Sequence, residues 1–287
     1  MLIRLLNKCE IHINQHLEII KMIKPKVLVL TGYGINCDEE TQFAFEKAGA
    51  IAERVHVNDL FHKKKKLGGY QILAFPGGFS YGDDTGSGNA LAGRIRNHLS
   101  EEIKEFVGKD KLVIGICNGF QVLTRLGLLP AIDEKYGEQQ VALVHNDNAR
   151  YTDRWVDLEF SGNSPWVHGL EQMMIPIAHG EGKLYAPAET LEKLKKKNLI
   201  AARYVKGEAC EYQNLTPNPN GSLDDIAALT DESGKVFGLM PHPERAMQFT
   251  QLPNWTFLKE KYKRAHQKIP DEGPGIKIFE NGVNYFK

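Results

Sequence analysis

The sequence predicts an α/β fold, an open and mostly parallel twisted sheet with helices on both faces and extra β elements in the second half. Short apolar strands alternate with helical patterns between residues 26 and 116, a rhythm that is typical of parallel sheets covered by helices. Further apolar, β-rich segments follow residue 140. The chain has 287 residues, which is enough for one large domain of this kind.

The first half contains the β-α-β pattern, and turn residues mark its boundaries. The first strand follows Pro25, the first helix ends at Gly49, and the third strand ends at the turn Pro76 to Gly78. In order, the expected elements are a strand at 26–30, a glycine-rich turn at 31–34, a helix at 38–48, strands at 51–57 and 71–75, a helix at 89–107 and a strand at 112–116.

The second half is richer in strand signals. Strands are expected at 141–144, 155–160, 200–204, 226–230 and 236–240, and a helix at 254–267. Residues 270–287 contain several glycines and are expected to form an irregular tail. Residues 1–24 resemble an appended extension. Their apolar residues fall roughly at helical spacing, which is consistent with a short amphipathic helix, and Met22 is a second candidate start. We therefore divide the chain into an extension (1–24), one main domain (25–269) and a tail (270–287).

Composition excludes several classes of function. Thirty-six basic and thirty-six acidic residues balance, so no net field attracts nucleic acid or a membrane surface. The four cysteines form no CxxC pair, which argues against a zinc or disulfide framework and for a reducing, cytoplasmic location. No apolar run is long enough to span a membrane, and polar residues interrupt the N-terminal segment where a signal peptide would need an apolar core.

Cys117 is the candidate nucleophile. It follows the apolar strand 112–116, precedes a helical pattern, and has Gly115 and Gly119 two positions to either side. Such a strand-to-helix turn needs small neighbours, because a Cβ at either glycine would collide with the turning chain. A helix N-terminus also favours the thiolate, the form that attacks carbonyl carbons. A buried structural cysteine is the alternative, and the flanking glycines argue against it.

A base and an oxyanion hole are expected at the ends of neighbouring strands. His242 follows the strand 236–240, and Glu244, two residues on, points the same way in an extended chain and is placed to orient the imidazole. Backbone N–H groups of Gly77, Gly78 and Asn118 are the candidate oxyanion donors, because active sites of open parallel sheets lie at the carboxyl ends of the strands. His-Pro-Glu and Pro-Gly-Gly are weak signals alone, and their combination with Cys117 is specific.

At these residues the chain resembles the class I, triad-type glutamine amidotransferases, whose core is flavodoxin-like. Residues 115–121 are similar to their nucleophile motif and residues 241–244 to their His-x-Glu pair. Within that group, the chain is similar to the glutaminase subunits of phosphoribosylformylglycinamidine synthases, enzymes of purine biosynthesis. The segments that carry this resemblance lie between residues 26 and 247, at 36–38, 76–83, 117–121, 178–183, 218–222 and 240–245.

The resemblance implies a mechanism and partners. Cys117 would attack the side-chain amide of glutamine, His242 would take and return the proton, and a glutamyl thioester would be hydrolysed. Gln121 would help to hold glutamine. Ammonia would pass to a large synthetase subunit of the same complex, with a small accessory subunit as a further partner. No cofactor is expected on this chain, which lacks a Gly-x-x-x-x-Gly-Lys phosphate loop, so ATP and magnesium are expected on the synthetase.

Residues 84–89 depart from the family pattern, which continues after Asp83 with an aromatic residue and an arginine. The departure puts the mobility of this loop and the contact with the partner in question. Three alternatives remain open: a glutaminase of another biosynthetic pathway, a non-catalytic scaffold with the same fold, and a cysteine hydrolase on a similar sheet.

Overall fold

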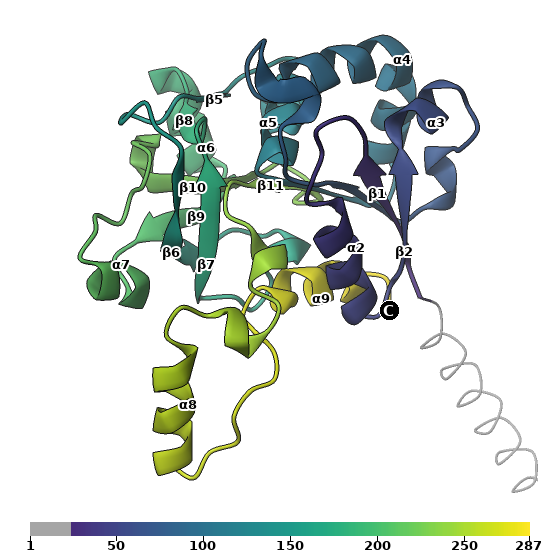
Figure 1. Cartoon of the computed structure of the whole chain (residues 1–287). Coiled ribbons are helices and arrows are strands. Elements are labelled where there is room, and N and C mark those ends of the chain that lie inside the picture. Colours follow the sequence, from purple (N-terminus) through teal and green to yellow (C-terminus); the bar gives the residue numbers. More distant parts are fainter. Residues whose placement is uncertain (1–23) are drawn as a thin grey trace, which may run out of the picture.

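The computed structural model describes residues 24–287, and Figure 1 shows their arrangement. Within these residues one sheet of nine strands runs through the molecule in the order β2-β1-β3-β4-β11-β10-β9-β6-β7. The predicted helical extension lies outside the described residues, except for Lys24. None of the described helices combines the length and the apolar character needed to cross a membrane.

One half of the sheet is parallel, as predicted. Its strands in spatial order are β2 (Ile51–His56), β1 (Lys26–Thr31), β3 (Ile72–Phe75), β4 (Leu112–Ile116) and β11 (Val236–Leu239). Every residue of the last three strands is buried, which is the pattern of a parallel sheet covered on both faces. Because β3, β4 and β11 run in the same direction, their carboxyl ends lie at one edge, and the turn at Gly77, Cys117 and His242 follow there.

The other half of the sheet is antiparallel and contains the extra β elements predicted for the second half of the chain. Its strands are β10 (Ile226–Thr230), β9 (Ile200–Val205), β6 (Thr152–Phe160) and β7 (Gln172–His179). A separate antiparallel pair is formed by β5 (Ala142–Val144) and β8 (Lys183–Tyr185). The predicted fold class is therefore confirmed. The sequence analysis missed β8 and also β7, which is the edge strand of the antiparallel half and pairs with β6.

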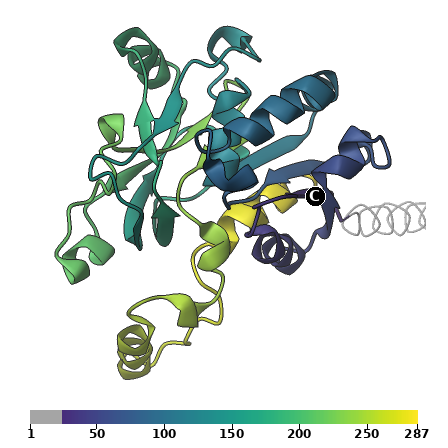
Figure 2. The same cartoon turned by 45° about the horizontal axis from the view of Figure 1, so that its top comes forward.

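Helices cover both faces of the parallel half, as Figure 2 shows. On one face α4 (Asn89–Val107) packs against α5 (Asn118–Arg125), and on the other α2 (Asp38–Lys47) packs against α9 (Ile276–Asn284). The buried residues of α4 recur every three or four positions, from Leu91 to Phe106, and this periodicity gives a helix one apolar face. The remaining helices are α3 (Val57–Phe61), α6 (Ala188–Lys196), α7 (Glu208–Gln213) and α8 (Trp255–Arg264), with short 3-10 turns at 67–69, 80–83, 132–134, 165–167, 223–225, 243–245 and 249–251.

The prediction of an irregular C-terminal tail is wrong for residues 276–284, which form α9. Phe279 is fully buried and meets the ring of Phe45 edge-on at 5.0 Å. The glycines that suggested a flexible tail serve close packing instead. A Cβ at Gly275 would lie 2.0 Å from the carbonyl oxygen of Pro243, and one at Gly282 would lie 2.3 Å from the ring of Trp166. The division of the chain at residues 24 and 269 stays a prediction.

Candidate active site

Cys117 occupies a sharp turn between β4 and α5. Its φ of +51° and ψ of −106° are unusual for a residue with a side chain, and such strain persists only where the surroundings enforce it. A Cβ at Gly119 would lie 1.9 Å from the carbonyl oxygen of Phe75, and one at Gly115 would lie 2.7 Å from the carbonyl oxygen of Gly119. The two flanking glycines are therefore required by space, as the sequence analysis predicted.

The Cys117 thiol lines a small pocket at the carboxyl edge of the sheet. Its side chain is almost buried, and its Sγ atom lies 3.7 Å from the carbonyl oxygen of Ala178 at the end of β7. The pocket has a volume of about 200 Å³, and it is bounded by the loops after β3, β5 and β7. It is lined by Gly78, Phe79, Asp83, Ser87, Cys117, Gln121, His145, Tyr151, Ala178, His179, Gly180 and Glu181.

His242 and Glu244 form a buried pair beside Cys117. The His242 Nδ1 atom lies 2.6 Å from Glu244 Oε1, which fixes the tautomer with the Nδ1 proton donated to the carboxylate. Among the described residues the His242 Nε2 atom has no hydrogen-bond partner, so it is free to exchange a proton. Burial alone lowers the pKa of His242, but the negative charges of Glu244 and Cys117 outweigh it and hold this pKa well above its ordinary value.

Backbone hydrogen bonds join the loop after β3 to the loop after β1. The N–H of Cys37 donates to the carbonyl oxygen of Gly77 at 3.2 Å, and the N–H of Phe79 donates to that of Gly34 at 2.7 Å. Gly78 has a φ of +145°, and a Cβ there would lie 2.6 Å from the Gly34 oxygen. Gly78 lines the pocket, whereas Gly77 packs against the His242 ring. The structure therefore places the predicted oxyanion loop against the histidine and at the pocket wall.

Asn118 and Gln121 connect the elbow to two neighbouring loops. The Asn118 amide accepts from the N–H of Ser80 at 3.2 Å and donates to Asp83 Oδ1 at 3.2 Å and to Gln121 Oε1 at 2.9 Å. The Gln121 amide in turn donates to the carbonyl oxygen of Glu181 at 2.5 Å. Both side chains are buried, so this network fixes the wall of the pocket around Cys117.

Hydrogen bonds also organise the loop at residues 84–89, where the sequence departs from the family pattern. Asp83 accepts from the Ser87 hydroxyl at 3.0 Å and from the Gly88 N–H at 3.3 Å. The N–H of Ser87 donates to Glu181 Oε2 at 3.2 Å. Gly86 and Gly88 therefore belong to a loop that is hydrogen-bonded both to Asp83 and to Glu181 on the opposite wall of the pocket.

His179 is a buried residue of the pocket lining. Its Nδ1 atom lies 3.2 Å from Asn146 Oδ1, and a Cβ at Gly182 would overlap its ring at 2.2 Å. Burial, assisted by the neighbouring His242, lowers the pKa of His179 to about 3. A ring of such low basicity is a poor general base, which leaves His242 as the better candidate.

Cys37 lies at the N-terminus of α2, and its side chain reaches the site. Its Sγ atom accepts from Arg245 Nη2 at 3.0 Å, and Arg245 Nε donates to Glu40 Oε1 at 3.2 Å. Burial raises the pKa of the Cys37 thiol, which disfavours a second nucleophile. Sequence reasoning missed that Cys37 sits beside His242. The signal was present, because both residues follow parallel strands at the same edge of the sheet.

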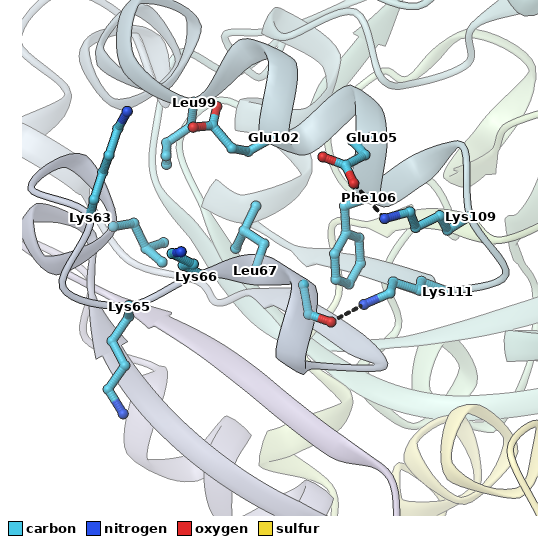
Figure 3. Close-up of a pocket in the computed structure, with 12 residues that line it drawn as sticks. Lys63, Lys65, Lys66, Leu67, Leu99, Glu102, Glu105, Phe106, Lys109 and Lys111 are labelled. Carbon is cyan, nitrogen blue, oxygen red and sulfur yellow. Dashed lines mark hydrogen bonds and ion pairs between the residues drawn. The ribbon is translucent and has the colours of Figure 1, made fainter.

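A larger hollow of about 410 Å³ lies elsewhere, between the segment after α3 and helix α4 (Figure 3). Its floor is apolar, and its rim carries Lys63, Lys65, Lys66, Lys109, Lys111, Glu102 and Glu105. Lys109 pairs with Glu105, and Lys111 donates to the carbonyl oxygen of Gly68 at 2.9 Å. None of the residues that line it is a cysteine, serine or histidine, so the smaller pocket at Cys117 is the candidate active site.

Residues 24–286 match the CobB/CobQ-like glutamine amidotransferase domain. The chain is 48% identical over 270 residues to phosphoribosylformylglycinamidine synthase subunit PurQ of Methanococcus maripaludis, covering 92% of this chain and 99% of that protein. It is 42% identical to the subunit of the same name from Dehalococcoides mccartyi, covering 92% and 98%. Among solved structures it is similar to a chain of PurLQS from Thermotoga maritima, with a TM-score of 0.68, 31% identity, and coverage of 92% and 100%.

Proposed function

This chain belongs to the CobB/CobQ-like glutamine amidotransferase family, and we propose that Cys117, His242 and Glu244 carry out its reaction. The chain is an enzyme, the glutaminase subunit of a phosphoribosylformylglycinamidine synthase. The observation that supports the proposed triad best is the buried 2.6 Å pair of His242 and Glu244, in which the charge of Glu244, followed by that of Cys117, raises the pKa of His242. The geometry and the charges suit proton transfer between sulfur and imidazole.

The first half of the reaction releases ammonia. The Cys117 thiolate attacks the side-chain amide carbon of glutamine, and a carbon–sulfur bond forms. Backbone N–H groups of Gly77, Gly78 and Asn118 receive the negative charge that develops on the amide oxygen. The carbon–nitrogen bond then breaks, and His242 gives its proton to the leaving nitrogen, which departs as ammonia.

The second half releases glutamate. A water molecule loses a proton to His242 and attacks the thioester carbon, and the carbon–sulfur bond breaks to regenerate the Cys117 thiolate. Glu244 holds the imidazole in one orientation through both halves. We assign Gln121 to the glutamine-binding wall, because its buried amide joins the elbow to the loop at Glu181.

The chain works in a complex with a large synthetase subunit and a small accessory subunit. We propose that ammonia passes from Cys117 to the synthetase, which uses ATP and magnesium to convert formylglycinamide ribonucleotide to the amidine. This chain supplies no cofactor of its own in that scheme. A cytoplasmic location stays a prediction.

The decisive experiment measures glutamate release and amidine formation by the reconstituted complex, with and without the nucleotide substrate. We expect glutamine hydrolysis that rises when the synthetase and its substrate are present. A complex that uses free ammonia normally but never hydrolyses glutamine would identify the chain as a non-catalytic scaffold. Hydrolysis without amidine formation would indicate another acceptor pathway.

A further inference from the structure

We propose that Cys37, His242 and Glu244 form a binding site for a thiophilic divalent cation such as Zn²⁺, and that a cation bound there switches the glutaminase off. A sulfur, a ring nitrogen and a carboxylate oxygen of these residues lie within 4.8 Å of one another. Zn²⁺ is bound by these three kinds of ligand at about 2.0–2.3 Å in tetrahedral geometry, so ligand atoms of one ion lie about 3–4 Å apart. A contraction of about 1 Å would close the set.

Glu244 provides an independent sign of a missing partner. Its Oε1 atom accepts from His242, but its Oε2 atom is buried and has no hydrogen-bond partner among the described residues. A buried carboxylate oxygen without a donor is unfavourable and calls for an explanation. A cation beside Glu244 would satisfy that oxygen, and carboxylates are common zinc ligands.

The proposed ligand set differs from the proposed catalytic triad because it contains Cys37 in place of Cys117. Its thiol is 1% exposed and is packed against the loop that carries Gly77, where a Cβ would lie 3.1 Å from Cys37 Sγ and 2.8 Å from His242 Cε1. Cys37 is therefore at the Gly77 side of the imidazole. The proposed site uses this thiol and leaves Cys117 out of the ligand set.

Arg245 controls access to the site. Its side chain is 37% exposed, and its guanidinium contacts both Cys37 Sγ and Glu40 at the surface. A cation must displace this guanidinium from the thiol, because the three ligands are otherwise buried. The site is therefore closed while Arg245 contacts Cys37, and a cation can bind and inhibit the enzyme only when this side chain moves away.

The consequence for activity depends on the proposed role of His242, whereas the metal binding does not. A cation on the imidazole and on Glu244 occupies the groups that orient and supply the proton. The histidine can then neither accept the proton of Cys117 nor deliver one to the leaving nitrogen. Glutamine hydrolysis should stop while the synthetase continues to use free ammonia.

The test measures Zn²⁺ binding to the full chain by equilibrium dialysis, and Co²⁺ binding by the thiolate-to-cobalt charge-transfer absorption. The variants are Cys37→Ser, Cys117→Ala and Cys210→Ser, the last being a matched buried cysteine away from the site. All retain Cys9, so any binding there is common to them. We expect one tight site in the parent, Cys117→Ala and Cys210→Ser proteins, and at least about tenfold weaker binding in Cys37→Ser.

Two results would overturn the proposal: unchanged binding in Cys37→Ser, or loss of binding in Cys117→Ala, which would place the ion between Cys117 and His242. Circular dichroism checks the fold of each variant. Glu244→Gln provides a second ligand test should Cys37→Ser fail to fold, and it too must weaken binding. In the complex, Zn²⁺ should inhibit glutamine hydrolysis of the parent at least tenfold more effectively than that of Cys37→Ser, each relative to its own metal-free rate. If the parent complex lacks glutaminase activity, the proposed function fails while the binding measurements still test the site.

Discussion

The side-chain amide of Asn118 accepts a hydrogen bond from the N–H of Ser80 at 3.2 Å, so the residue after the nucleophile holds the loop that follows β3. The same amide donates to Asp83. Because both ends of the amide are used, the spacing between the elbow and the proposed oxyanion loop is set by one buried side chain. A substitution of Asn118 should therefore alter catalysis.

Replacing Asn118 with Ala should lower the glutaminase kcat while the chain still folds. The change leaves the buried Ser80 N–H without its acceptor, at a cost of about 1–3 kcal/mol to stability, and it releases the loop at Gly78. We expect the loss mainly in kcat, because the oxyanion develops only in the transition state. Steady-state kinetics of the complex with glutamine would check this. A change confined to KM would contradict it.

Replacing Cys117 with Ala should abolish glutamine hydrolysis and covalent labelling by a glutamine-like electrophile. No other described cysteine lines the pocket with Cys117, so no second thiol of the described residues is placed there to take the label. The Cys210→Ser variant is the control, since that buried thiol lies outside the pocket, and it should label normally. Mass spectrometry of the labelled chain is the measurement, and label on Cys117→Ala would refute the assignment.

Replacing Glu244 with Gln should reduce kcat by on the order of 10²–10⁴-fold, because the His242 tautomer is no longer fixed by a charge. Glu244 raises the pKa of His242 against the effect of burial, so the variant should have a lower His242 pKa. The alkaline loss of activity should accordingly begin at lower pH in Glu244→Gln than in the parent. Overlapping pH profiles of kcat would show that Glu244 does not act through His242.

The sequence was sufficient to predict the parallel half of the fold and the candidate site residues that follow its strands. Helix α4 and strand β4 have the predicted bounds, because apolar periodicity and adjacent turns specify both. It was insufficient for β7, where Pro176 interrupts the apolar run, and for α9, whose glycines resemble those of a flexible tail. The contacts of Glu181 with Ser87 and Gln121 could not be derived either, because they depend on how loops from distant strands meet.

His179 should make the chain sensitive to acid. Burial lowers its pKa to about 3, whereas the unfolded chain has an ordinary value near 6.5. Between these values the unfolded state binds the extra proton, so the free energy of unfolding should fall as the pH drops from 6.5 toward 3, by at most about 1.4 kcal/mol per pH unit. Urea unfolding at several pH values should show a shallower slope for His179→Asn. His145→Asn, whose ring is 82% exposed, is the control, and equal slopes in all three proteins would exclude His179 as the cause.

Two glycine substitutions should have opposite effects on stability, and the pair tests the steric account of the elbow. A Cβ at Gly119 would lie 1.9 Å from the Phe75 carbonyl oxygen, whereas nothing lies within 4 Å of one at Gly93 in α4. Gly93→Ala should stabilise the chain by about 0.5–1 kcal/mol, because alanine loses less backbone entropy in a helix. Gly119→Ala must displace β3 or α5 and should lower both the melting temperature and the glutaminase rate. Thermal unfolding and glutamate release measure the two effects. A Gly119→Ala protein as stable and as active as the parent would show that the turn around Cys117 can accommodate a Cβ at residue 119, contrary to the steric account.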